Sequence, residues 1–103
     1  MNEAARAVAV LKEKRLTLAT AESCTGGLLG KLVTDVPGSS AVYLGGVISY
    51  AYAVKERLLG VDAALLQEQG AVCAEVADQM ARGVRTRLHA DVSLATTGNA
   101  GPG

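Results

Sequence analysis

The stretch Glu22-Ser23-Cys24-Thr25-Gly26-Gly27 gathers a carboxylate, two hydroxyls, a thiol and two glycines in one turn. It lies between a run typical of a β-strand and a helical pattern that begins near Leu28. A strand that turns directly into a helix presents unpaired backbone N–H groups and the positive end of the helix dipole. Such a turn can hold an anion or an oxyanion beside the Ser23 hydroxyl. The simpler interpretation is that Ser23 or Thr25 only caps the helix, which is a far more common role.

A second group of reactive side chains occupies residues 49–57, where a strand-like run passes into another helical pattern. If this strand lies beside the first one, their carboxyl ends meet at the edge where open α/β sheets bind ligands. Tyr50 and Lys55 could then face Ser23. A lysine whose pKa is lowered by burial can act as a general base, with a tyrosine hydroxyl relaying a proton. The residues alone favour a simpler alternative, in which Lys55 is solvated and Tyr50 belongs to the core.

A third candidate is the glycine-rich stretch at residues 96–103, which follows another strand-like run. Glycines and hydroxyls in this position can form a backbone nest for a phosphate or carboxylate, and the alternative is a disordered chain end. Other catalytic templates do not fit. The sequence matches neither GxxxxGK[ST] nor G-x-S-x-G. A Ser-His-Asp triad would need His89, which we expect on the surface.

The elements that must position these groups follow from hydrophobic periodicity and from turn residues. The last predicted helix, at residues 75–88, carries Val76, Met80, Val84 and Leu88 on one apolar stripe. The glycine pair Gly45-Gly46 interrupts a strand and indicates a bulge or a close backbone approach. Helices are predicted at residues 2–14, 26–36, 53–59, 62–69 and 75–88, and strands at residues 16–21, 42–50 and 91–97.

Strands separated by helices predict a layered α/β/α domain with a mixed, partly parallel sheet. The 103 residues suffice for one such domain, spanning 1–103. Half of the residues are hydrophobic but none is Phe or Trp, so the core must be aliphatic. Three strands that end in a glycine-rich loop indicate a domain whose C-terminal part is missing.

Composition also disfavours several classes of protein. Ten basic and ten acidic residues cancel, and no basic run is paired with aromatic residues, which argues against nucleic-acid binding. There is no apolar stretch of membrane-spanning length, so we expect a soluble, cytoplasmic protein. Cys24, Cys73 and His89 do not have the spacing of zinc ligands. We therefore expect reduced thiols and no metal site.

Taken together, the motifs resemble those of the CinA C-terminal domain family, the nicotinamide-nucleotide amidohydrolases also called PncC. The resemblance runs in collinear order over residues 16–103, and it rests on three segments: "AESCTGGLLGKLVTDVPGSSAVYLGGVISYAYAVKERLLGV", "GAVCAEVADQMARGVR" and "TGNAGPG". It implies hydrolysis of the carboxamide of nicotinamide mononucleotide to nicotinic acid mononucleotide and ammonia, in pyridine nucleotide recycling. It implies no metal or organic cofactor.

The resemblance also assigns roles to individual residues and replaces the interpretation of Ser23 as a cap. It implies Ser23 as the nucleophile, with Tyr50 and Lys55 assisting. The backbone N–H groups of Thr25, Gly26 and Gly27 would stabilise the oxyanion, and a glycine-rich turn would hold the 5′-phosphate. Glu22 would orient the turn, and Cys24 would be a packed residue. The implied substrate-binding residues are Thr25, Gly26, Gly27, Gly46, Thr97, Gly98 and Gly101.

The chain departs from the family pattern in two places. Asn99 stands where the family has an aliphatic residue, and a tyrosine-asparagine pair is common where this chain has Tyr50-Ala51-Tyr52. Family domains also continue past the glycine-rich loop. We therefore expect exposed apolar surface and self-association into a homo-oligomer. The alternative function is a catalytically inactive homologue that acts as a nucleotide-binding, phosphate-binding or interaction module.

Overall fold

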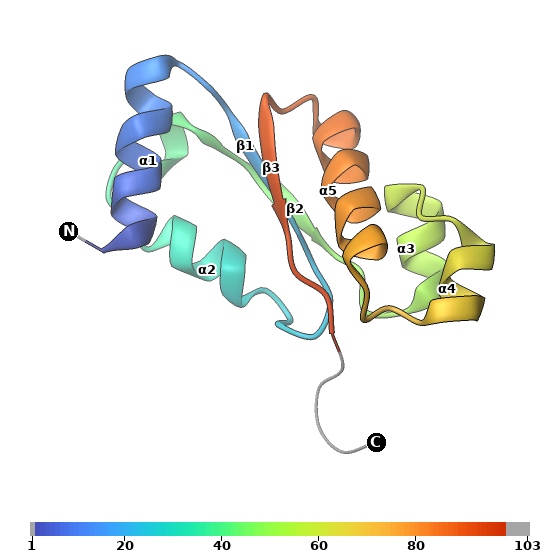
Figure 1. The fold of residues 1–103 in the computed structure, drawn as a ribbon. Helices are drawn as coiled ribbons and strands as arrows, with labels where there is room; N and C mark the ends of the chain where they lie inside the picture. The colour runs from blue at the N-terminus through green and yellow to red at the C-terminus, as the bar shows by residue number, and fades with distance from the viewer. Residues whose placement is uncertain (1, 99–103) are drawn as a thin grey trace.

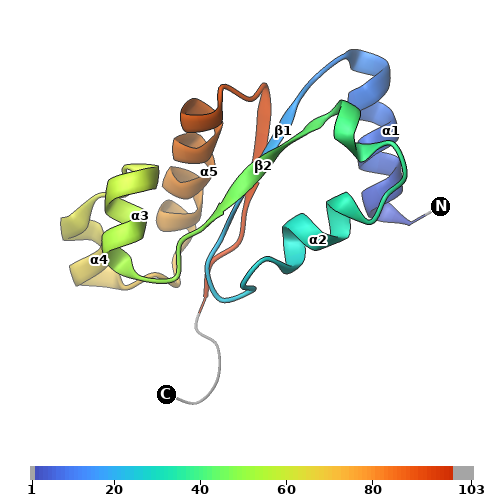
Figure 2. The same ribbon diagram turned by 180° about the vertical axis from the view of Figure 1, so that it is seen from behind.

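The computed structural model describes residues 2–98 and consists of one sheet between two layers of helices (Figures 1 and 2). The sheet contains β1 (Leu18–Glu22), β2 (Tyr43–Ile48) and β3 (Val92–Ala95) in the order β2-β1-β3. Both pairings are parallel, so the described strands all run in one direction. The predicted layered α/β fold is confirmed.

The two helical layers cover opposite faces of the sheet (Figures 1 and 2). One layer holds α1 (Glu3–Lys14) and α2 (Leu28–Thr34), which leads into the short 3-10 helix η1 (Ser39–Ala41). The other holds α3 (Tyr52–Leu59), α4 (Ala63–Gln69) and α5 (Ala74–Leu88). None of these helices, within residues 2–98, is long and apolar enough to cross a bilayer.

Two aliphatic clusters fill the space between the layers, as the composition requires. On the α5 side, Val76, Met80 and Val84 of the predicted stripe are fully buried against the sheet, and Leu88 is partly buried. On the α1 side, Val8 and Val33 pack against Leu18. Because each face of the sheet has its own cluster, β1 is buried at every residue and forms the centre of the domain.

Several predicted boundaries were wrong by one or two residues, and two of the predicted starts were wrong for clear local reasons. The helix expected from residue 26 begins at Leu28, because Gly26 and Gly27 both have left-handed backbone conformations, with φ of 60° and 110°. The strand expected from residue 16 begins at Leu18. Arg15 ends α1 in a left-handed conformation, and the Leu16 N–H donates back to the Leu11 carbonyl.

The predicted bulge at Gly45-Gly46 is confirmed. Leu18 pairs with Tyr43 but Ala19 pairs with Gly45, so β2 carries one extra residue at this point. Gly45 has a φ of 143°. Gly46 lies so close to β1 that an added Cβ would stand 2.7 Å from the Thr20 carbonyl oxygen. The bulge sets the register that follows, in which Glu22 pairs with Ile48.

Candidate functional site

The carboxyl ends of β1 and β2 lie side by side, and each is followed by a buried serine. Ser23 follows Glu22, the last residue of β1. Ser49 follows Ile48, the last residue of β2, which pairs with Glu22. The Ser49 backbone N–H donates to the Glu22 carbonyl at 2.7 Å, and its hydroxyl donates to the same oxygen at 3.1 Å. These bonds extend the pairing of the strands by one residue and fix the backbone beside Ser23.

The helix α3 brings Lys55 to this edge. Its Nζ donates a hydrogen bond to the Ser23 Oγ at 2.9 Å, although the two residues are 32 positions apart. The Lys55 side chain is fully buried and Ser23 is 3% exposed. The structure therefore brings together two of the three predicted catalytic residues. The interpretation of Lys55 as a solvated helix residue was wrong.

Two backbone carbonyls complete the surroundings of the amine. Lys55 Nζ donates to the Ser49 carbonyl at 2.5 Å and to the Tyr50 carbonyl at 3.1 Å. Loss of solvent around the buried amine lowers the pKa of Lys55, and the nearby Cys24 thiol opposes this by favouring the charged form. Burial therefore biases Lys55 toward the neutral amine that a general base must be.

Tyr50 is placed differently from what its predicted role suggests. Its side chain is 70% exposed, so the alternative of a core tyrosine was wrong as well. Its hydroxyl makes no hydrogen bond to any residue within 2–98, and only its carbonyl contacts Lys55. A tyrosine side chain near the amine is instead Tyr52, whose ring centroid lies 5.8 Å from the Lys55 Nζ. The assisting role of Tyr50 stays a prediction.

The turn after β1 is organised by the Glu22 carboxylate, which is 2% exposed. It accepts hydrogen bonds from the Thr25 hydroxyl (2.8 Å) and from the backbone N–H groups of Gly27 (3.1 Å), Leu29 (2.8 Å) and Gly30 (2.9 Å). Burial alone would raise the pKa of Glu22, but these four bonds outweigh it and lower the pKa below its ordinary value. Glu22 therefore orients the turn as an ionised side chain.

This arrangement changes the predicted oxyanion site. The Gly27 N–H is taken by Glu22, and the Gly26 N–H donates to the Ser23 carbonyl at 3.2 Å. Neither is free for a ligand. Within residues 2–98, the backbone N–H groups of Cys24 and Thr25 have no acceptor. Among the residues from Cys24 to Gly27 these two, and not the glycines, are the backbone donors without an acceptor in the described part of the chain, so they are the candidates to bind an oxyanion.

The third predicted stretch approaches the same turn from β3. The Thr96 hydroxyl lies 2.9 Å from the Thr25 hydroxyl. Gly98 lies against Cys24, since an added Cβ would stand 3.2 Å from its Sγ. The Thr97 hydroxyl points elsewhere and donates to the Ala71 carbonyl at 2.8 Å. Gly101 falls outside the described residues.

Among the predicted site residues, Gly46 lies farthest from the carboxyl ends of the strands. It pairs with Thr20, three positions before Ser23, and it lines a small cleft between β2 and α2. The structure thus explains Gly46 by close backbone packing, and its contact with substrate stays a prediction.

Sequence reasoning gave no role to Ser49, Thr96 and Tyr52. A signal for Ser49 was present, because a serine at the end of the second strand mirrors Ser23 at the end of the first. Nothing in local sequence could show that Thr96 would reach Thr25, since that contact depends on the pairing of β1 with β3.

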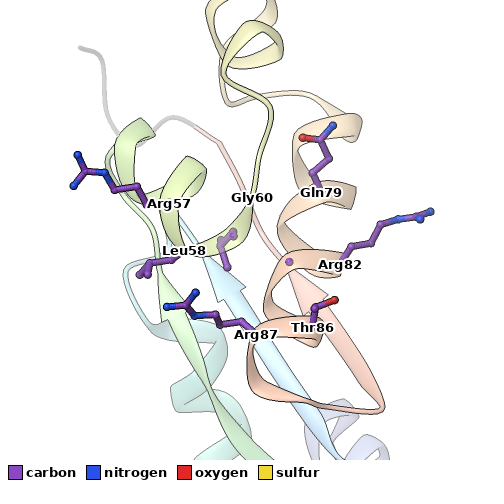
Figure 3. A pocket seen from close by; sticks show the side chains of 9 residues that line it. Arg57, Leu58, Gly60, Gln79, Arg82, Thr86 and Arg87 are labelled. Atoms are coloured by element: carbon purple, nitrogen blue, oxygen red, sulfur yellow. The ribbon is translucent and has the colours of Figure 1, made fainter.

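A separate surface groove runs between α3 and α5, and Figure 3 shows the side chains that line it. It contains three arginines, but Arg57 and Arg82 extend away from it on opposite sides (Figure 3). Arg82 also pairs with Asp78 at 2.9 Å. The charges do not converge on one point, and none of the residues that line this groove belongs to the Ser23–Lys55 pair.

The fold and the site define an α/β domain with a buried serine–lysine pair at the carboxyl end of parallel strands. The chain belongs to the CinA family: the model of the CinA C-terminal domain matches residues 2–103. Among curated relatives, the CinA-like protein of Synechococcus sp. (strain CC9902) is 58% identical over 100 residues. The CinA-like protein of Geobacter sulfurreducens is 59% identical over 93 residues.

Solved structures agree with this assignment. The competence/damage inducible protein CihA from Agrobacterium tumefaciens gives a TM-score of 0.91 at 42% identity, and covers 98% of this chain. A CinA superfamily protein from Escherichia coli gives a TM-score of 0.92 at 35% identity, and covers 96%. This chain spans 62% and 58% of those two structures. The match to the Synechococcus protein covers 97% of this chain but 24% of that protein. The match to the Geobacter protein covers 90% of this chain but 22% of that protein.

Proposed function

We propose that this protein is a nicotinamide mononucleotide amidohydrolase in which Ser23 is the nucleophile and Lys55 the general base. The observation that carries the proposal is the set of three hydrogen bonds around the Lys55 amine. A neutral amine has two N–H groups and one lone pair. If the Ser49 and Tyr50 carbonyls accept the two N–H groups, the lone pair is left for the Ser23 hydroxyl at 2.9 Å. The surroundings can therefore accommodate the neutral form of lysine, which is the form that can accept a proton.

The reaction would begin with attack of Ser23 Oγ on the carboxamide carbon, while Lys55 takes the hydroxyl proton. The negative charge that develops on the carbonyl oxygen would be stabilised by the N–H groups of Cys24 and Thr25, which have no acceptor within residues 2–98. Lys55 then returns the proton to the amide nitrogen, and ammonia leaves. The remaining acyl group is joined to Ser23 by an ester bond.

Water would complete the cycle. A water molecule attacks the ester carbon while Lys55 takes one of its protons. Lys55 then gives that proton to the Ser23 oxygen as the ester bond breaks. The products are a free carboxylate and the original enzyme. The Tyr50 phenol is exposed and without an acceptor within residues 2–98, so it is available to a bound substrate. Its assisting role follows from the family resemblance.

The test is the release of ammonia and nicotinic acid mononucleotide from nicotinamide mononucleotide by the 103-residue protein. Ser23→Ala should abolish turnover, and Lys55→Met should reduce kcat by at least about 100-fold, as expected for loss of a general base. Ser40→Ala and Lys12→Met are matched controls, because both residues are exposed and far from the pair in sequence.

Turnover that survives in Ser23→Ala would show that Ser23 is not the nucleophile. Binding of nicotinamide mononucleotide without turnover by the folded wild type would instead support the alternative, a nucleotide-binding module. Calorimetric titration of the wild type and of Ser23→Ala distinguishes these outcomes, because it measures binding without requiring the reaction.

A further inference from the structure

Tyr52, the first residue of α3, makes two contacts that the proposed reaction does not use. Its ring faces the buried end of Lys55, with 5.8 Å between the ring centroid and Nζ. Its hydroxyl accepts a hydrogen bond from the Ala71 N–H at 3.2 Å. The nearby Tyr50 makes neither contact through its side chain, and 70% of that side chain is exposed, compared with 45% for Tyr52.

The second contact matters because Ala71 connects three parts of the fold. Its N–H is held by Tyr52 on α3, and its carbonyl accepts from the Thr97 hydroxyl just beyond β3. Ala71 itself is only 5% exposed, and it lies in the segment 70–73 between α4 and α5. One backbone unit thus joins the start of α3 to the end of β3, the strand whose Thr96 contacts the turn of Ser23 through Thr25.

We propose that Tyr52 is a positioning residue of the Ser23–Lys55 site, whose ring holds the Lys55 amine in place and whose hydroxyl fixes segment 70–73 against α3. The role of Lys55 in this inference rests on the function proposed above. The two contacts use different parts of the tyrosine, so two substitutions separate them. Tyr52→Phe removes only the hydroxyl, and Tyr52→Leu removes the ring as well.

The ring has an electrostatic consequence. The face of an aromatic ring is electron-rich and favours a nearby ammonium over a neutral amine. Within residues 2–98, the other titratable group that faces Lys55 is the Cys24 thiol, which acts in the same direction. The segment after β2 contributes only the Ser49 and Tyr50 carbonyls. Tyr52 therefore limits how far burial lowers the pKa of Lys55, and its loss should let that pKa fall further.

The experiment is an NMR titration of protein labelled with ¹³C at lysine Cε, in which the Lys55 signal is assigned by its absence from Lys55→Met. Tyr52→Leu should lower the pKa of Lys55 by about half a unit, and Tyr52→Phe should leave it at the wild-type value. Amide hydrogen exchange on the same samples should show faster exchange of the Ala71 N–H in both variants, because each has lost its acceptor. Circular dichroism checks that both variants fold.

An unchanged pKa of Lys55 in Tyr52→Leu, or an equal fall in Tyr52→Phe, would overturn the role of the ring. Unchanged exchange at Ala71 in Tyr52→Phe would overturn the role of the hydroxyl. If Tyr52→Leu does not fold, Tyr52→Phe still tests the role of the hydroxyl. Tyr52→Met then replaces Tyr52→Leu as the test of the ring. None of these readouts needs turnover, so they remain decisive even if the protein releases no ammonia.

Discussion

Lys55 combines complete burial with a full set of hydrogen-bond partners. A buried ammonium has three N–H groups to satisfy, and in this site Ser23, Ser49 and Tyr50 each supply one oxygen. The same geometry serves the neutral amine if the Ser23 hydroxyl becomes the donor. Proton transfer between Ser23 and Lys55 thus needs no rearrangement of heavy atoms, which is the property expected of a preorganised base.

The pH dependence of turnover should reflect this lysine. Because burial lowers the pKa of Lys55 from its ordinary value of 10.5, the rate should rise with pH through a pKa below 10.5. The fully charged form below that pKa cannot accept the serine proton. Measurement of kcat/KM for nicotinamide mononucleotide across pH 5 to 10 checks this. A rate that continues to rise through the ordinary lysine range would show that Lys55 is not the base.

Glu22→Gln should destabilise the fold by about 1–3 kcal/mol near neutral pH, because an amide cannot accept all four of the hydrogen bonds that the buried carboxylate accepts. The folded-state pKa of Glu22 lies below the ordinary 4.5. The stabilisation from its charge is therefore fully present above 4.5 and is lost as the pH falls through the lowered folded-state pKa.

Urea unfolding of wild type and Glu22→Gln at pH 7 and pH 3 measures this effect, and the difference between them should shrink at the lower pH. The exposed Glu13 on α1 provides the matched control, Glu13→Gln, with little change at either pH. A loss of stability that is the same at both pH values would contradict the assigned charge state of Glu22.

The packing of α3 on α5 determines where Lys55 lies, and one glycine permits it. A Cβ added to Gly83 of α5 would stand 1.9 Å from the Leu59 carbonyl oxygen and 2.6 Å from its carbon. These are backbone atoms at the C-terminal end of α3, so no side chain can rotate away to make room. The helices approach this closely only because residue 83 has no side chain.

Gly83→Ala should therefore destabilise the protein by about 1–3 kcal/mol and reduce kcat by displacing α3 and its Lys55. Gly30→Ala on α2 is the matched comparison, because its added Cβ would approach within 3.0 Å only the Tyr43 hydroxyl, the end of a side chain. Thermal melting and turnover of both variants check the prediction. Equal effects from the two substitutions would show that the α3–α5 crossing is not the rigid contact described.

At the level of the whole domain, both outer strands leave apolar surface exposed. Beside β3, a groove between α1 and the sheet contains Val10 and Leu94, which are 48% and 51% exposed. On the opposite edge, β2 exposes Leu44 and Ile48. Exposed strand edges with apolar neighbours favour pairing with another chain. The expected homo-oligomer thus has two candidate contact surfaces.

We propose that the groove beside β3, which is lined mostly by apolar side chains, carries the self-association. Leu94→Lys should shift the protein to monomers without loss of secondary structure, because a charge would be buried in an apolar contact. Leu44→Lys on β2 is the matched control and should leave the oligomer intact. Sedimentation velocity measures both. A wild type that sediments as a monomer would disprove the oligomer, and dissociation by Leu44→Lys alone would move the contact to β2.

Short-range patterns in the sequence were enough for the elements and for the family. The apolar stripe of α5 and the bulge at Gly45-Gly46 were both predicted correctly, because each depends on neighbours within a few residues. Asn2 and Asp62 cap their helices through hydrogen bonds to residues two or three positions away. Ser23 and Lys55 were candidates from two local motifs, but the residues alone favoured a helix cap and a solvated lysine, and the family resemblance assigned their catalytic roles.

What local patterns left open was decided by tertiary packing. The approach of Lys55 to Ser23 depends on the parallel pairing of β1 with β2 and on the close crossing of α3 with α5, which join residues far apart in sequence. The burial that lowers the pKa of Lys55 arises from the same packing. The Gly27 amide is used within the turn because of where the Glu22 carboxylate is held, and within residues 2–98 the Cys24 and Thr25 amides have no acceptor. The types of side chain in each motif can be read from the local sequence, but their burial and the distances between them are properties of the folded molecule.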